Sequence, residues 1–167
     1  IAGPGGDANL LREMIVAGNI GSAGLCIGPA QNTFEIVTKY ASERVVAGQP
    51  IKEHSINAGM LADIAIGIET ARTYTLSVAH MADRPEIYGP RWSNEMVAKA
   101  RIAKVYAADV AINVTNEAMR LMGSNGYTRS FDVEKHWRDT KIAQQWLGGS
   151  ILGRLDIARY YCHLKTI

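Results

Sequence analysis

The stretch RLMGSNGYTRSFDVEKHWRDTKIAQQWLGGS, residues 120–150, holds the end of one helical pattern, a glycine turn and the whole of the next helical pattern. Gly123 and Gly126 supply permissive backbone to the turn, which ordinarily indicates a helix C-terminal cap. Arg120 nearby adds positive charge, so the same turn could also face a phosphate with its amide groups. The pair Gly148-Gly149 then breaks the second pattern.

Three longer helical patterns lead up to this turn. Apolar residues at three- and four-residue steps predict one helix over residues 10–44 and, after the break VVAGQPIKEH, a second from about Ile51 to the segment ADRPEIYGP. A third helix is predicted from about Trp92 to Met122. The fourth is predicted in two parts, Val133–Leu147 and Ser150 to about His163.

Long amphipathic helices joined by short connections pack as antiparallel neighbours. The fold class predicted is therefore all-α: an up-down four-helix bundle whose last helix is split, with one domain over residues 1–167. Sustained alternation of apolar and polar residues, which would indicate strands, is missing from the sequence. Trp92 is expected in the core, and Trp137 either in the core or in a contact with another subunit.

Composition and spacing exclude several kinds of function. The chain is 47% hydrophobic and 20% charged, and inspection finds no apolar run near the roughly 18 residues of a membrane span. A net charge of +2, with both signs mixed along the chain, gives nucleic-acid binding no support. No histidine follows a glutamate by three residues, so no metal site is predicted. Cys26 and Cys162 are expected to be free thiols in a reducing compartment.

The amino-terminal segment IAGPGGDANLL has neither the basic start nor the apolar block of a secretory signal. Because the chain starts at Ile1, we expect a fragment or a processed chain. The expected location is cytoplasmic, or the mitochondrial matrix if the source is eukaryotic.

Four motifs in order resemble the carboxy-terminal helical domain of the acyl-CoA dehydrogenases, flavoproteins that oxidise the Cα–Cβ bond of acyl-CoA thioesters. Residues 40–55, YASERVVAGQPIKEHS, are similar to the family's Y-x-x-x-R-x-x-F-G-x-P-I-x-x-x-Q segment, and residues 121–142 to its G-G-x-G-(Y/F)…V-E-(K/R)…R-D-x-K-I segment. Arg12 with the glycines that follow matches the family's first helix, and Arg154–Arg159, RLDIAR, its closing helix.

The resemblance implies a larger functional unit. In the family, an amino-terminal helical domain and a middle β domain precede the bundle, FAD lies between the β domain and the bundle, and a second subunit's bundle contributes to the FAD site. Both preceding domains are absent from this chain, so the chain alone is expected neither to hold FAD tightly nor to turn over substrate. The implied partners are an acyl-CoA substrate, an electron-transfer flavoprotein and further subunits in a homo- or hetero-oligomer.

The resemblance also locates the catalytic base, a carboxylate that removes the α-proton while a hydride leaves Cβ for the flavin. Most members place a glutamate directly before a Gly-Thr or Gly-Gly pair, where this chain has Leu147. A minority place it one residue before the matched Arg12, which adjoins the acyl pocket, and here that residue is Leu11. Leucine accepts no proton at any pH. Glu13 is predicted to point elsewhere, because one residue turns a helical side chain by about 100°.

Several cofactor-facing positions that the resemblance assigns have also changed. The cofactor-binding positions in this numbering are Arg44, Ala47, Ser55, Arg120, Gly123, Ser124, Gly126, Gly148 and Gly149. The family's phenylalanine, two glutamines, glycine and threonine are replaced by Ala47, Ser55, Arg120, Ser124 and Gly149. The Arg120 guanidinium could still attract a pyrophosphate.

Three functions are compatible with these residues. The first is the C-terminal domain of an FAD-dependent acyl-CoA dehydrogenase-like oxidoreductase whose base lies elsewhere. The second is a catalytically silent subunit that closes the site of an active partner, and the third is a plain helical interaction module.

Overall fold

The computed structural model describes residues 7–164 of the 167-residue chain. In chain order its elements are α1 (Ala8–Glu43), β1 (Val45–Val46), β2 (Gln49–Pro50), the 3₁₀ turn η1 (Ile51–Glu53), α2 (Ser55–Ala82), α3 (Pro85–Tyr88), α4 (Asn94–Met122), η2 (Gly123–Tyr127), α5 (Val133–Gln145), η3 (Trp146–Gly148) and α6 (Gly149–Tyr161).

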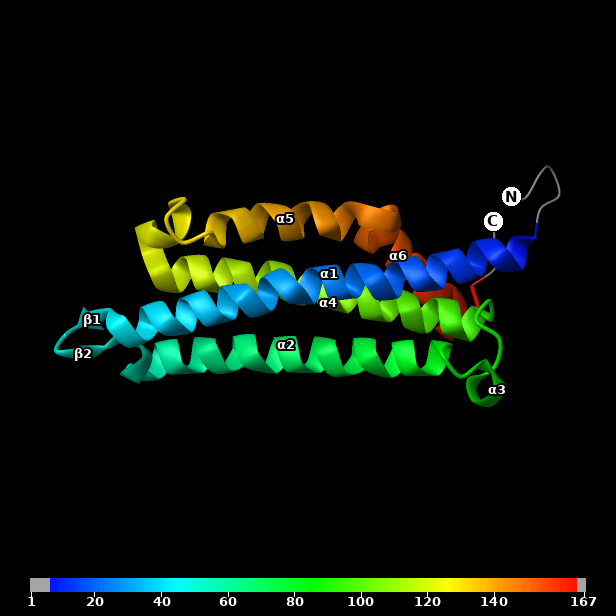
Figure 1. Cartoon of the computed structure of the whole chain (residues 1–167), viewed down its shortest axis with the longest axis horizontal. Helices are drawn as coiled ribbons and strands as arrows, with labels where there is room; N and C mark the ends of the chain where they lie inside the picture. Colours follow the sequence, from blue (N-terminus) through cyan, green and yellow to red (C-terminus); the bar gives the residue numbers. More distant parts are fainter. Residues whose placement is uncertain (1–6, 165–167) are drawn as a thin grey trace.

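The long helices form an up-down bundle (Figure 1). α1, α2 and α4 run the length of the molecule, and α5 with α6 fill the fourth position. α4 is central, since it packs against α1, α2, α5 and α6. The predicted all-α bundle with a split last helix is thus confirmed.

A row of small residues lets α4 occupy the centre. Its buried face carries the alanines Ala100, Ala103, Ala107, Ala111 and Ala118, each at most 1% exposed. Their three- and four-residue spacing keeps them on one side of the helix, and alanine allows neighbouring helix axes to approach closely. Larger side chains from α1 and α2, including Val37, Ile64 and Ile68, then complete the core.

The connections differ from the sequence prediction in three places. β1 and β2 form a two-residue hairpin that the sequence did not indicate, since strands this short leave no alternation to detect. Ala47 and Gly48 in its turn have φ angles of 51° and 84°, the two positive values that a tight hairpin turn requires. α2 begins at Ser55 rather than Ile51, because η1 comes first. α4 begins at Asn94 because the Ser93 hydroxyl caps it, accepting from the Met96 amide at 3.1 Å.

The prediction that Trp92 belongs to the core was wrong. It lies before the cap of α4 and is 40% exposed, whereas Trp137 on α5 is half-buried. The Trp137 indole donates from Nε1 to Asn116 Oδ1 at 2.7 Å, which ties α5 to α4.

α1 is unusually apolar for a bundle helix. No charged residue occurs from Met14 to Phe34, and α1 is the one described helix that is long and apolar enough to cross a bilayer by length and composition alone. Sequence inspection predicted no such helix. A bundle helix can meet the same two criteria, and α1 packs along α4, α2 and α5. Its outer face nevertheless exposes Leu11, Met14 and Leu25.

Gly126 offers a sharp test of the packing between η2 and α4. A Cβ added there would lie 2.9 Å from the Met119 Cα and 3.2 Å from the Met119 carbonyl oxygen, and this backbone cannot rotate away. We expect Gly126→Ala to lower the free energy of unfolding by about 3 kcal/mol, measured by urea denaturation.

The matched control for this substitution is Gly21→Ala on α1. A Cβ at Gly21 meets nothing within 4 Å, so alanine there should stabilise the helix by roughly 0.5–1 kcal/mol. Equal unfolding midpoints for Gly126→Ala and the unmodified chain would show that the turn does not pack as described.

Candidate functional site

The break between α5 and α6 places three residues with positive φ angles in succession. Leu147 has φ 54° and ψ 42°, and it is followed by Gly148 at φ 92° and Gly149 at φ 67°. A leucine in this region costs roughly 1–2 kcal/mol, because its Cβ crowds the following carbonyl. The surrounding structure must therefore hold the backbone of Leu147 in place.

The Leu147 side chain lies against α1 at Gly18. A Cβ added to Gly18 would come within 3.0 Å of the Leu147 Cδ1, so the glycine leaves room for the leucine. Leu11 stands seven residues before Gly18, two helical turns or about 10.5 Å along the same face. The two positions that the resemblance assigns to a catalytic base therefore face one side of α1, and both are leucine and partly exposed.

Arg101 on α4 fixes the strained backbone at Leu147. The guanidinium is buried and donates from Nη1 to the Leu147 carbonyl oxygen at 2.8 Å and to Asn19 Oδ1 at 3.3 Å. Its Nε donates to Asp156 Oδ2 at 3.0 Å. Arg101 thus joins α1, the break and α6 through one buried cation.

Lys104, one turn further along α4, holds the end of α5. Its side chain is fully buried, and Nζ donates to the Gln144 carbonyl oxygen at 2.7 Å. Burial lowers the pKa of Lys104, and burial raises the pKa of the neighbouring Cys26 thiol to about 11. A cation at the carboxyl end of α5 is also favoured by the helix dipole.

Sequence reasoning missed Arg101 and Lys104, although a signal was present. Lys104 follows Ala100 by four residues, so the alanine stripe of α4 places it on the core side of the helix. A charged residue on a core stripe indicates a buried polar contact. Its partners could not be found this way, because Arg101 meets residues 55 and 82 positions away.

The glycine turn of η2 lies at the opposite end of the bundle from α6 (Figure 1). Asn125 Nδ2 donates to the Tyr40 hydroxyl at 2.9 Å, and the Tyr40 ring packs edge-on against Phe131. These contacts seat the turn on the carboxyl end of α1. The hairpin and the start of α2 come to the same end, which gathers seven of the assigned cofactor positions: Arg44, Ala47, Ser55, Arg120, Gly123, Ser124 and Gly126.

Within this end, the geometry shows a helix cap. The Gly123 amide donates to the Arg120 carbonyl oxygen, with Gly123 at φ 58°. Arg120 is held by Glu117, with Nη1 at 2.7 Å from both carboxylate oxygens. Glu134 and Arg138, one helical turn apart on α5, pair at 2.8 Å, and the hydrogen bond from Arg138 lowers the pKa of the Glu134 carboxyl.

Within one chain, the assigned residues at the break between α5 and α6 lie far from the assigned residues at the η2 end. Gly18, which contacts Leu147, lies 26 residues before Arg44, and this corresponds to roughly 39 Å along α1. The break with Leu147, Gly148 and Gly149 and the η2 end are therefore separate surfaces. Within residues 7–164 no cluster of three or more His, Cys, Asp or Glu side chains could hold a metal ion.

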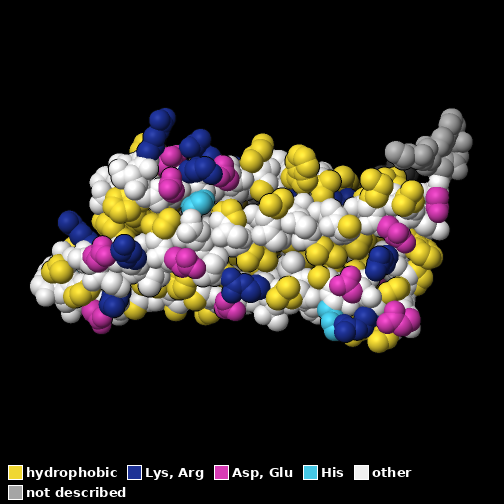
Figure 2. Space-filling model, in the orientation of Figure 1, with side chains coloured by type: hydrophobic (Ala, Val, Ile, Leu, Met, Phe, Trp, Pro, Cys, Tyr) yellow, Lys and Arg dark blue, Asp and Glu magenta, His cyan; other side chains and the backbone are white. Residues whose placement is uncertain are grey.

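An apolar hollow of about 330 Å³ adjoins the break and is lined by Ser22, Leu25, Ile142, Ala143 and Trp146. Leu25, Ile142 and Trp146 are each more than 60% exposed. Figure 2 shows hydrophobic side chains gathered over this part of α5, whereas charged side chains gather over its beginning. The lining of the hollow is almost entirely apolar, so it offers few groups for hydrogen bonding.

Comparison with known proteins agrees with this geometry. The family described as "Acyl-CoA dehydrogenase, C-terminal domain" matches residues 8–161. The chain is 28% identical over 155 residues to the mitochondrial short-chain specific acyl-CoA dehydrogenase of Homo sapiens, covering 93% of this chain and 36% of that protein. It is 33% identical over 149 residues to the short-chain specific acyl-CoA dehydrogenase of Clostridium acetobutylicum, covering 89% of this chain and 37% of that protein.

Among solved structures, butyryl-CoA dehydrogenase from Megasphaera elsdenii superposes with a TM-score of 0.82 at 28% identity, covering 94% of this chain and 39% of that chain. The chain spans little more than a third of the length of the curated relatives that it matches.

Proposed function

The chain belongs to the acyl-CoA dehydrogenase family, and on this premise we propose that it works as the carboxy-terminal bundle of an FAD-dependent oxidoreductase acting on acyl-CoA thioesters. The observation that carries the proposal is the break at Leu147. The buried Arg101 holds the strained backbone there. The Leu147 side chain faces α1, at the position where the family places a catalytic carboxylate.

The residues of this chain fit a share of an FAD site rather than the whole site. The apolar hollow at Leu25, Ile142 and Trp146 would take one face of a flat ring beside Leu147. Arg44 and Arg120, at the other end of the bundle, would attract phosphates. FAD, when bound, would accept the hydride from the substrate's Cβ. The roughly 39 Å between the two ends supports a site to which two subunits contribute.

The uncovered face of α1 supports the presence of further domains in the working protein. Leu11, Met14 and Leu25 expose between 60% and 69% of their surface, and no charged residue occurs between Met14 and Leu25. Large exposed apolar patches on soluble proteins mark interaction surfaces. The middle β domain and the amino-terminal helical domain of the family would cover this face, and an acyl-CoA would lie between them and α1.

A second candidate is a silent subunit that pairs with an active partner. Leucine at both base positions favours it. Arg101, which binds the Leu147 carbonyl, also binds the Asp156 carboxylate. The same carboxylate accepts from Arg159 at 3.1 Å, so two cations already engage it. In such a hetero-oligomer the η2 end of this chain would complete the partner's FAD site, and an electron-transfer flavoprotein would reoxidise the partner. We propose a cytoplasmic location, or the mitochondrial matrix if the source is eukaryotic, since the name of the human relative includes the mitochondrion.

One experiment separates these functions. The whole polypeptide that carries this chain is purified alone, its flavin per subunit is measured from the visible spectrum, and acyl-CoA oxidation is followed with an artificial electron acceptor. Bound flavin with turnover would establish the dehydrogenase and refute the silent subunit. Bound flavin with little turnover, the result expected from the two leucines if no other residue supplies the base, would favour the silent subunit over the dehydrogenase. A protein without flavin and without acyl-CoA binding would contradict both functions and leave the interaction module.

A further inference from the structure

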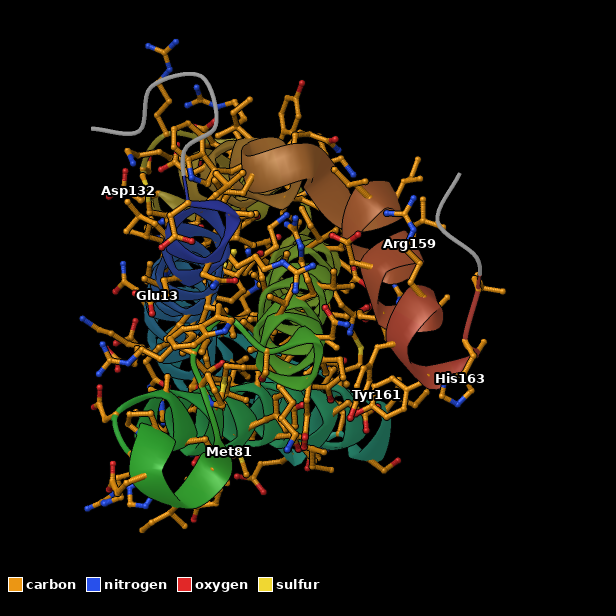
Figure 3. The ribbon with its side chains drawn as sticks, turned by 90° about the vertical axis from the view of Figure 1, so that its right-hand side faces the viewer. Glu13, Met81, Asp132, Arg159, Tyr161 and His163 are labelled. Carbon is orange, nitrogen blue, oxygen red and sulfur yellow. The ribbon has the colours of Figure 1, made fainter. Side chains whose placement is uncertain are left out.

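A second hollow, of about 380 Å³, lies at the end of the bundle where α1 and α4 begin and α6 ends. Figure 3 looks onto this end and labels Arg159 on α6. The polar part of its lining comprises Arg12, Asn94, Arg101, Asp156, Arg159 and Tyr160. Glu13, adjacent in sequence to Arg12, lines a different hollow with Asp83 and Arg91.

The charges of this hollow are unbalanced. Three guanidiniums and one carboxylate line it, which leaves two positive charges uncompensated within the lining. Asp156 is shared, since Oδ2 accepts from Arg101 at 3.0 Å and Oδ1 from Arg159 at 3.1 Å. Arg12 donates only to neutral acceptors among residues 7–164, to Asn94 Oδ1 at 2.7 Å and to the Trp92 carbonyl oxygen at 3.4 Å.

The three cations differ in their freedom to bind. Arg101 is buried and already has three partners, so it contributes a positive charge at a fixed position in the lining. Arg159 has one carboxylate bond and keeps a third of its side chain exposed. Arg12 is exposed and has no carboxylate partner in the described part of the chain. Arg12 and Arg159 therefore have donors to spare toward the same hollow.

We propose that this hollow binds the oxyanion group, carboxylate or phosphate, of a small ligand between Arg12 and Arg159. Arginine presents a planar fork of donors that matches both kinds of oxyanion. A volume of about 380 Å³ is near the lower end for ligand pockets, which suits a small molecule. The Tyr160 and Asn94 side chains add neutral polar groups to the lining.

The test is calorimetric titration of the whole polypeptide at low ionic strength, with inorganic phosphate in one arm and glutarate in the other. We expect saturable binding of at least one of them, with a Kd of about 1 mM. Arg12→Gln with Arg159→Gln should weaken this binding at least about tenfold, because both charge-assisted contacts are lost. Binding confined to one arm identifies the ligand's oxyanion as phosphate or carboxylate.

Arg154→Gln is the matched control, since it removes an equal charge from α6 but lies outside the hollow and pairs with Asp109. It should leave the affinity within about twofold, as expected for screened surface charge. Absence of saturable binding in both arms would overturn the proposal. So would an equal loss in Arg154→Gln, since general charge would then explain the binding. Circular dichroism of each variant verifies that the bundle is intact.

Discussion

Arg101→Met is expected to lower the free energy of unfolding by about 3 kcal/mol, the larger of two effects predicted for the arginines around Asp156. The substitution removes the cation that links α1, the break and α6, and it leaves Asn19 and the Leu147 carbonyl without this donor. Asp156 keeps its bond to Arg159, which limits the loss. Urea unfolding measures the change through the midpoint, provided that the slope is unaltered.

The control is Arg159→Met, which removes the other cation from the same carboxylate. The Arg159 side chain is 34% exposed, and its partner within residues 7–164 is the half-buried Asp156, so its loss should cost less than about 1 kcal/mol. If both substitutions lower the midpoint equally, Arg101 does not hold the break.

Helical periodicity was sufficient to predict the bundle. Alanine and β-branched residues recur on one side of α4 and α2, and this spacing depends on local geometry that any core-facing helix shares. The hairpin at Val45–Pro50 escaped prediction because two-residue strands carry no pattern. The start of α2 was misplaced for a related reason, since η1 is apolar at Ile51 and continues the helical spacing without being part of the helix.

The site was predictable only in outline. Motif spacing located Leu147 and Gly148 at the break, but the contact between Leu147 and Gly18 depends on how α6 leaves α5, which three positive φ angles determine. The partners of Arg101 lie on three different elements, and nothing local in the sequence joins them. The long-range polar contacts of Arg101 could therefore not be predicted, although they hold Leu147, the residue that the motif identified.

Leu147→Glu in the whole polypeptide is expected to raise acyl-CoA oxidation at least about 100-fold, if the missing base alone silences the chain, because general-base catalysis contributes about 10²–10⁴-fold. The position can accept the change. Leu147 already occupies its strained backbone without being glycine, its side chain is 38% exposed, and the lack of a side chain at Gly18 leaves space beside α1. The Arg101 bond is to the backbone carbonyl, so it is retained in the variant.

The control for this gain is Leu147→Gln, which has the shape and polarity of glutamate without a carboxylate. Turnover with acyl-CoA and an artificial electron acceptor should rise only in the glutamate variant, and flavin content should be equal in both. Leu11→Glu tests the alternative position two turns away on the same face of α1, where a smaller gain is expected because Leu11 is more exposed at 60%. Equal rates for the glutamate and glutamine variants at position 147 would mean that the chain lacks more than its base. A carboxylate at position 147 would then be present without increasing substrate oxidation.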